Sequence, residues 1–329
     1  MSARKRVSVV IPALNEEQHI PLCLSAIMSV DYPEGDVEII VVDNGSTDRT
    51  VLLAREMGAT VIEKPGATIA EMRNTGARRG SGEIIAFVDA DTVVDRGWLV
   101  AAVRNLSNPR IGAVGSRLQI PQNASWIERL WAEQQREQNY AGEIHWLGSA
   151  NLVVTRECFD GVGGFDPRLR TSEDVDLCGR IRGAGYVILS DPEVRATHLA
   201  NPKTLADLFR RELWYGKDTL RMFLQNPAQG KHAKSLTLAI LYAVSVLLVP
   251  VAAYALALWG LLWPSVLAAS LLLGPPLLKS MVVTMQKRRW ALFLPLVLLY
   301  IIYGVARGLA LLYPGNWHVW SSKDRTRAP

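Results

Sequence analysis

Two aspartates lie two residues apart, directly after an apolar stretch. Asp89 and Asp91 follow the run 83–88, whose composition is typical of a strand buried on both faces of an α/β sheet. If the extended backbone continues that far, the two side chains share one face. Two like charges so placed need compensation, and a divalent ion such as Mg²⁺ or Mn²⁺, shared with substrate phosphates, would provide it. The alternative is an Asp-rich turn.

A third aspartate, Asp43, ends the apolar run 38–43 and precedes the turn residues 44–48. In open α/β sheets, ligands bind beyond the carboxyl ends of the strands. A carboxylate at that place can accept hydrogen bonds from the amide or imide edge of a base, or from a ribose. Asp43 can equally serve as the Asx-turn acceptor of the loop that it opens. The sequence leaves both interpretations open.

Strand-like and helical patterns alternate through the first 92 residues. Four apolar runs predict strands: 6–12, 38–43, 60–63 and 83–88. The short connections between elements are typical of a parallel, doubly wound sheet. Asn15, with Gln18 three residues later, is predicted to cap the first helix. The first turn lacks the G-x-G-x-x-G pattern, which argues against a dinucleotide-binding Rossmann site.

Long apolar runs occupy the C-terminal third of the chain. Residues 235–278 contain no Asp, Glu, Lys or Arg, and a second run covers 290–313. A transmembrane helix needs about 20 apolar residues, so the first run has room for two spans and the second for one span or a re-entrant segment. Basic residues on both sides of the first run place both flanks in the cytoplasm. Since no signal-peptide pattern begins the chain, we expect a multi-pass protein of the cytoplasmic membrane with its soluble part on the cytoplasmic side.

Charge and cysteine content narrow the expected partners. The net charge of +5 fits a protein resting on an anionic membrane surface, and membrane lipids are expected partners. No basic stripe interleaved with aromatic residues marks the soluble part, so we expect no nucleic acid. Cys23, Cys158 and Cys178 have no metal-type spacing, which argues against a disulfide framework and a zinc site.

Four motifs, in this order, resemble those of a family 2 glycosyltransferase of the GT-A fold: 7–17, 41–48, 73–77 and 89–91. The resemblance covers residues 5–215. It implies an α/β fold with a GT-A-type doubly wound, mostly parallel sheet, followed by C-terminal transmembrane helices. It also implies an inverting transferase that uses a UDP- or GDP-sugar and Mn²⁺ or Mg²⁺, in the synthesis of a cell-envelope polysaccharide or glycolipid.

The resemblance also assigns roles to residues. Asp174, in the pair Glu173-Asp174, corresponds to the general base that deprotonates an acceptor hydroxyl, and both are predicted catalytic residues. Asp89, Asp91 and His198 are the predicted metal ligands. The predicted nucleotide-sugar contacts are Pro12, Asn15, Glu16, Asp43, Arg73, Asp89, Ala90 and Asp91, and the predicted acceptor-side residues are Gly148 and Ser149.

Each of these roles has a structural alternative. Glu173 and Asp174 can be explained as acids that stabilise a helix N-terminus, with Ser172 as its cap. A lone histidine such as His198 is usually structural. Arg73 can equally be a residue at the surface or at the edge of the core.

The predicted organisation has four parts: a GT-A nucleotide-sugar transferase domain at 1–203, an amphipathic interfacial helix and linker at 204–234, a membrane region at 235–313, and a basic tail at 314–329. In the interfacial helix, Arg210, Arg211, Lys217 and Arg221 are expected to face lipid headgroups. A helix near Trp126, Leu130 and Trp131 is predicted to be amphipathic, with its apolar side in a core.

The predicted function is a membrane-anchored transfer of sugar from a nucleotide-diphosphate donor to a lipid-linked or saccharide acceptor. Two other classes remain open. A catalytically inactive GT-A-like scaffold is one, although the intact acids argue against it. A nucleotidyltransferase is the other, and it would be expected to carry a glycine-rich basic loop where this chain has the acidic segment 12–17. Segment 211–214 only loosely resembles the Q-x-x-R-W motif of processive synthases, so processivity stays open.

Overall fold

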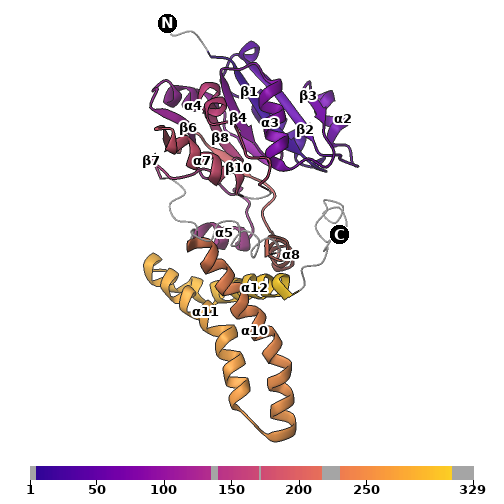
Figure 1. The fold of residues 1–329 in the computed structure, drawn as a ribbon, viewed down its shortest axis with the longest axis vertical. Helices are drawn as coiled ribbons and strands as arrows, with labels where there is room; N and C mark the ends of the chain where they lie inside the picture. The colour runs from indigo at the N-terminus through magenta and orange to yellow at the C-terminus, as the bar shows by residue number, and fades with distance from the viewer. Residues whose placement is uncertain (1–4, 135–139, 170–171, 217–229, 313–329) are drawn as a thin grey trace. The chain divides into compact units, whose positions relative to one another are not determined.

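The structure is a computed structural model that describes residues 5–134, 140–169, 172–216 and 230–312 (Figure 1). The chain divides into two compact units. We call Met1–Gln122 with Gln135–Asn201 the sheet unit, and Asn123–Gln134 with Pro202–Pro329 the helical unit. The segment 123–134 therefore belongs with the C-terminal helices, although in sequence it interrupts the sheet unit.

An eight-stranded, mostly parallel sheet forms the sheet unit, in the order β3-β2-β1-β4-β8-β6-β9-β7. Its strands are β1 (Val7–Ala13), β2 (Val37–Asp43), β3 (Thr60–Glu63), β4 (Ile84–Val88), β6 (Ile111–Gly115), β7 (Gly142–Glu143), β8 (Asn151–Thr155) and β9 (Val187–Ser190). A second, two-stranded sheet pairs β5 (Thr92–Val94) antiparallel with β10 (Ala196–His198). The predicted sheet is confirmed. What the sequence does not reveal is that β8 runs antiparallel to β4 and β6, because apolar content carries no strand direction.

Helices cover both faces of this sheet. They are α1 (Ile20–Met28), α2 (Thr50–Glu56), α3 (Ile69–Arg79), α4 (Trp98–Leu106), α6 (Arg156–Gly161) and α7 (Glu173–Gly183), with a 3₁₀ turn at Glu34–Asp36. Val9 and Ile11 of β1 pack with α1, α2 and α4, whereas Val10 and Phe87 pack on the opposite face with α3, α6 and α7. Because β1 and β4 are buried on both faces, β4 is an unbroken apolar run and β1 is interrupted only by Ser8.

The predicted cap of the first helix is wrong. Helix α1 begins at Ile20, and Pro21 in its first turn suits that start because proline lacks the N–H that a helix leaves unpaired there. Asn15 instead has a left-handed backbone, φ 55°, and its side-chain oxygen accepts a hydrogen bond from the Thr47 N–H at 2.8 Å. Asn15 therefore ties the loop after β1 to the loop after β2.

Two other local predictions also fail. The extended backbone does not reach Asp91, because β4 ends at Val88 and a turn follows in which the Thr92 N–H donates to the Asp89 carbonyl at 3.0 Å. The shared strand face predicted for Asp89 and Asp91 is thus replaced by a turn. Ser172 stands at the N-cap of α7, but its backbone is left-handed and its side chain makes no capping hydrogen bond.

The helical unit contains α5 (Trp126–Gln134), α8 (Leu205–Gly216), α10 (Gly230–Trp259), α11 (Trp263–Lys287) and α12 (Phe293–Leu312), with a 3₁₀ turn at Trp290–Leu292. Among the described residues, three helical segments are long and apolar enough to cross a membrane: Ala233–Trp259, Trp263–Lys287 and Trp290–Leu312. Figure 1 shows α10 and α11 as a hairpin. Gly304 of α12 lets Tyr242 of α10 approach closely, since a Cβ there would overlap the tyrosine ring.

Helix α8 differs from its prediction. It begins with a reciprocal cap, in which Thr204 Oγ1 and Asp207 each bond the other's backbone N–H. The expectation that Arg211 faces headgroups is wrong, because its side chain is only 15% exposed and its guanidinium lies 4.8 Å from the Trp131 ring. Leu208 packs with Leu130 of α5 and Leu296 of α12, so the apolar side of α5 does lie in a core. The end of the predicted interfacial helix, at 217–225, and the basic tail 314–329 lie outside the described residues.

Candidate active site

A buried arginine joins two carboxylates from distant parts of the sheet unit. Arg73, 3% exposed, donates through one terminal nitrogen to Glu173 Oε1 at 2.7 Å and through the other to Asp89 Oδ1 at 2.8 Å. Burial opposes the charged guanidinium, but Asp89 and Glu173 outweigh that effect, so the pKa of Arg73 lies above its ordinary value. The alternative that Arg73 lies at the surface is wrong.

Three features of α3 hold Arg73 in place. The helix begins with a capping box between Thr68 and Glu71. One turn after Arg73, Gly76 lies against β1 so closely that a Cβ would overlap Val10. The Asn74 side chain makes two hydrogen bonds to the backbone of Phe165. Its oxygen accepts from the Phe165 N–H at 2.9 Å, and its nitrogen donates to the Phe165 carbonyl at 2.7 Å. The position of Arg73 is thus fixed by cap, helix–strand packing and turn together.

Asn74 is a residue that the sequence reasoning missed. Its neighbour Arg73 was singled out, yet Asn74 is the residue that attaches the turn before α7 to α3. A signal was available, because asparagine is unfavourable inside a helix unless its side chain has a specific partner. The Gly-Gly turn fits the same contact: Gly164 has φ +67°, and a Cβ there would lie 2.8 Å from Asn74 Oδ1.

The two acids at the start of α7 have different partners. Glu173 is held by Arg73, whereas Asp174 Oδ1 accepts from the Val175 N–H at 2.7 Å. Burial raises the pKa of Glu173, against the opposing effect of Arg73. Burial also raises the pKa of Asp174, against opposing hydrogen bonds that include one from the backbone of Ser149. Gly148 borders the same carboxylate, since a Cβ there would lie 3.9 Å from Asp174 Oδ2. The two predicted acceptor-side residues therefore lie next to the predicted base.

Asp91 and His198 form a second group. The pairing of β5 with β10 sets His198 opposite Thr92, and the Leu199 N–H donates to the Asp91 carbonyl at 2.8 Å. As a result, His198 Nε2 lies 3.3 Å from Asp91 Oδ2. His198 Nδ1 is buried and has no hydrogen-bond partner within the described part of the chain. The imidazole therefore has one nitrogen without a partner and the other, Nε2, beside a carboxylate, and the pair of Nε2 and Asp91 Oδ2 is the feature of the structure that suits a cation at this place.

The donor set bears on which cation fits. Across the described residues, no group of three or more His, Cys, Asp or Glu side chains is placed to hold a metal ion, and Asp89 is engaged by Arg73. Asp91 and His198 would fill only two positions of a divalent ion. Magnesium-like ions are commonly held by one or two protein groups, with substrate phosphate oxygens and waters completing the shell. The residues therefore fit an ion that is shared with a phosphate-bearing substrate.

Asp43 and the loop after β1 form a third group. Asp43 is 1% exposed, and its Oδ2 accepts from the Gly45 and Ser46 N–H groups, both at 2.8 Å, while Oδ1 accepts from Ser46 Oγ. The structure thus shows the Asx-turn role, and the base contact stays a prediction. Glu16 Oε2 lies 2.7 Å from His19 Nδ1. Pro12, within β1, and Ala90, between the two aspartates, are both buried.

The sheet unit is similar in sequence to known sugar transferases. Residues 8–162 match the model of glycosyl transferase family 2. Glycosyltransferase AglE of Haloferax volcanii is 29% identical over 245 residues, which cover 71% of this chain and 80% of AglE. The pre-mycofactocin glycosyltransferase of Mycobacterium tuberculosis is 25% identical over 238 residues, 68% of this chain, and the chain spans about half of that protein, 49%.

A solved structure shares the fold. The mannosyltransferase PcManGT from Pyrobaculum calidifontis, in complex with GDP-Man and Mn²⁺, superposes with a TM-score of 0.57 at 22% sequence identity. The match covers 94% of this chain and 88% of that protein. At this level of identity the likeness establishes a common fold, and the roles of individual residues rest on the geometry described above.

Replacing Arg73 tests how much the site depends on it. Arg73→Gln leaves Asp89 and Glu173 without their shared cation, so we expect the free energy of unfolding to fall by about 3–5 kcal/mol. Urea unfolding of the detergent-purified protein measures this change. The control Arg96→Gln removes an exposed pair with Asp31 and should change stability by less than about 1 kcal/mol. Equal effects of the two substitutions would show that Arg73 does not organise the site.

Proposed function

We propose that this chain, whose residues 8–162 match the model of glycosyl transferase family 2, transfers a sugar from a UDP- or GDP-sugar to a lipid-linked or saccharide acceptor. The observation that carries the proposal is the arrangement around Arg73. This residue binds Asp89, directly after the end of β4, and Glu173 at the start of α7, next to Asp174. A neighbour of the same fold contains GDP-Man and Mn²⁺, which supports a nucleotide-sugar donor.

The chemistry assigned to this chain centres on Asp174. Its carboxylate removes the proton of the acceptor hydroxyl as the hydroxyl oxygen attacks the anomeric carbon of the donor sugar. The new bond to the acceptor oxygen forms while the bond to the nucleotide diphosphate breaks, and attack from the opposite face inverts the anomeric centre. Asp174 is assigned as base because its hydrogen bonds come from backbone N–H groups, whereas Glu173 is held by Arg73. Glu173 is therefore a positioning residue.

The leaving diphosphate needs stabilisation on the other side of the sugar. A divalent ion, Mn²⁺ or Mg²⁺, held by Asp91 and His198 would supply Lewis-acid stabilisation of the negative charge that develops there. Asp89 lies two residues before Asp91 and is held by Arg73. His198 is thus assigned to the metal, and Asp89 to the organisation of the site.

We infer that the three apolar helical segments confine the proposed transfer to the membrane surface. We assign the three apolar helical segments to a multi-pass cytoplasmic-membrane anchor with the sheet unit on the cytoplasmic side. An anchored transferase works on acceptors that reach the membrane surface, which favours a lipid-linked acceptor in cell-envelope glycolipid or polysaccharide synthesis. An inactive scaffold is the competing outcome of the experiments that follow.

Nucleotide binding tests the donor assignment. We would titrate UDP, GDP and ADP into the detergent-purified protein by isothermal calorimetry, with and without Mn²⁺. One nucleotide should bind in a metal-dependent way, and Asp91→Asn should weaken that binding at least about tenfold, because it removes a charged metal ligand. Asp31→Asn, at an exposed pair far from these groups in sequence, is the matched control. Absence of binding by any nucleotide, with or without metal, would favour the inactive scaffold.

Asp174→Asn tests the base and the acceptor together. A hydroxyl acceptor needs a general base, so we expect kcat to fall by about 10²–10⁴-fold. Because the pKa of Asp174 lies above its ordinary value, kcat/KM of the wild type should decline with falling pH already above the usual aspartate range, as the base becomes protonated. In Asp174→Asn, kcat/KM should no longer show this decline at low pH. Asp176→Asn, whose partner is Arg180 on the same helix, should leave the profile unchanged.

A retained rate in Asp174→Asn would have a specific meaning. A lipid phosphate is already ionised near neutral pH and requires little help from a base. Activity of the variant near the wild-type level would therefore exclude a hydroxyl acceptor that depends on Asp174. A phosphate acceptor, or a different base, would then have to replace this assignment.

A further inference from the structure

Two buried polar atoms next to the proposed metal ligands have no hydrogen-bond partner among the residues that the structure describes. They are Oγ1 of Thr92, in β5, and Nδ1 of His198, in β10. A hydroxyl or an imidazole nitrogen that is buried without a partner lowers the free energy of unfolding, because it has given up its hydrogen bonds to water. Two such atoms on neighbouring strands therefore require an explanation.

The strand register places the two side chains on one face. His198 lies directly opposite Thr92 in the antiparallel pair of β5 and β10, and Ala196 lies opposite Val94. Residues opposite each other on antiparallel strands project from the same face of a sheet, with Cβ atoms about 4.5–5.5 Å apart. Val94 and Ala196, two positions along each strand, pack in the core of the sheet unit. Thr92 and His198 therefore share the core-facing side of this two-stranded sheet.

A metal at His198 determines which ring nitrogen carries the proton. A neutral imidazole has one protonated nitrogen, and the nitrogen that binds a metal must be the other one. Nε2 is the nitrogen that lies 3.3 Å from Asp91 Oδ2. A cation held by Asp91 and Nε2 therefore requires the proton to be on Nδ1. Because Nδ1 is buried, its N–H group then needs an acceptor inside the protein.

The neighbouring backbone acceptors already have donors. The Asp89 carbonyl accepts from the Thr92 N–H at 3.0 Å and from the Cys23 thiol at 3.6 Å. The Asp91 carbonyl accepts from the Leu199 N–H at 2.8 Å. By contrast, the Thr92 hydroxyl oxygen can accept a hydrogen bond and has no partner in the described ranges of the chain. It is therefore the acceptor that suits the Nδ1–H group.

We propose, on the basis of the metal role assigned to His198 above, that Thr92 is a positioning residue for the metal. Its Oγ1 accepts a hydrogen bond from His198 Nδ1–H, directly or through one buried water, and so keeps Nε2 unprotonated beside Asp91. Histidines that bind metals usually donate their second ring N–H to an acceptor of this kind, which fixes the tautomer and the orientation of the ring. The Asp91 carboxylate favours a proton on Nε2, and the Thr92 hydroxyl favours a proton on Nδ1.

Removal of the hydroxyl separates this role from a role in folding. Valine has nearly the shape of threonine but lacks the hydroxyl. Because Thr92 Oγ1 has no partner among the described residues, Thr92→Val should leave the urea midpoint of the metal-free protein unchanged or higher. A lower midpoint would show that the hydroxyl serves folding and would overturn the assignment to the metal.

Metal affinity tests the positioning role. Mn²⁺ would be titrated into the full-length protein in detergent, in the presence of the nucleotide that the wild type binds, and free Mn²⁺ would be measured by electron paramagnetic resonance. Thr92→Val should weaken Mn²⁺ binding about tenfold or more, the usual effect of removing the partner of a metal-binding histidine. Thr92→Ser, which keeps the hydroxyl, should bind nearly as tightly as the wild type.

Thr197→Val is the matched control. Thr197 is the residue before His198 and lies opposite Val93, so its side chain projects from the other face of the same strand pair. Loss of this hydroxyl should leave the Mn²⁺ affinity unchanged. An equal loss of affinity in Thr197→Val and Thr92→Val would overturn the specific role of Thr92.

Pulsed electron paramagnetic resonance of the bound Mn²⁺ provides a second readout. With isotope-labelled histidine, the wild type and Thr92→Ser should show coupling of Mn²⁺ to a histidine nitrogen, and His198→Gln should remove this coupling. In Thr92→Val at saturating Mn²⁺, the coupling should be weakened or lost, because Nε2 is no longer kept unprotonated. A general change in packing would not produce this signature and its rescue by serine.

Two kinds of failure are distinguishable. Wild-type affinity and wild-type nitrogen coupling in Thr92→Val, or a Thr92→Ser variant as weak as Thr92→Val, would overturn the role of Thr92 and leave the proposed sugar transfer intact. Absence of nucleotide-dependent Mn²⁺ binding in the wild type would overturn the proposed metal-dependent function, and the role of Thr92 with it.

Discussion

A buried cation that is shared between two carboxylates is the constraint on which the sheet unit depends. An isolated charge in a protein interior is strongly unfavourable, so Arg73 can be buried only where Asp89 and Glu173 both reach it. Those residues lie at the end of β4 and at the start of α7, 16 and 100 positions away in sequence. These two ion pairs of Arg73 can therefore form only when β4, α3 and α7 have packed together. The same closure brings Asp174 to Ser149, so the predicted base is positioned by a structural ion pair.

The sequence predicted the elements of this arrangement better than the contacts between them. The four apolar runs and their helices follow from local spacing, and a family resemblance singled out Arg73 and the two acids that the structure brings to it. It could not show that Glu173 is held by Arg73 while Asp174 is not, because that contact depends on α7 packing beside α3. Asn15 failed as a cap because its side chain bonds a loop 32 residues away. The helix predicted near Trp126, Leu130 and Trp131 is present as α5, but only the tertiary structure shows that it packs within the helical unit.

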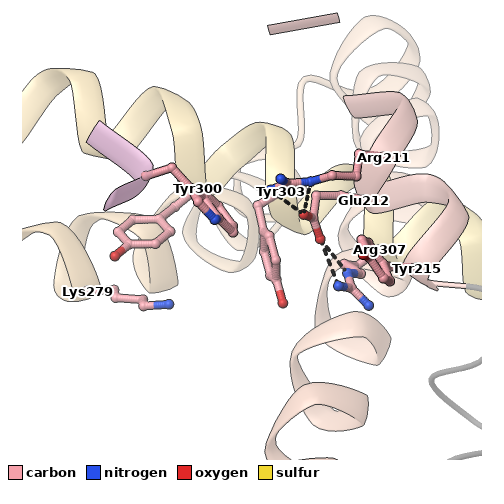
Figure 2. A pocket seen from close by; sticks show the side chains of 8 residues that line it. Arg211, Glu212, Tyr215, Lys279, Tyr300, Tyr303 and Arg307 are labelled. Carbon is pink, nitrogen blue, oxygen red and sulfur yellow. Dashed lines mark hydrogen bonds and ion pairs between the residues drawn. The ribbon is translucent and has the colours of Figure 1, made fainter. Parts of the chain in front are cut away.

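In the helical unit, which has no sheet among its described residues, close packing at small residues and a few polar contacts hold the helices together. Gly304 and Gly308 bring α12 against α10, and Gly216 brings α8 against Ala310 of α12. Close approach through small residues is the usual means of packing apolar helices when burial of apolar surface gives little discrimination. Glu212 then joins α8 to α12 through Arg307 (Figure 2). The sequence alone does not predict the Arg307–Glu212 ion pair, because it shows Arg307 only as an unusual charge in an apolar run.

The measurement that tests the proposed metal site most directly is anomalous diffraction at the manganese absorption edge. Crystals of the protein grown with Mn²⁺ and the nucleotide that it binds should show one strong anomalous peak within about 2.0–2.6 Å of an Asp91 carboxylate oxygen, with His198 Nε2 as a second protein ligand. A nucleotide bound without such a peak, or a peak coordinated by neither Asp91 nor His198, would contradict a metal-dependent donor site at this edge of the sheet.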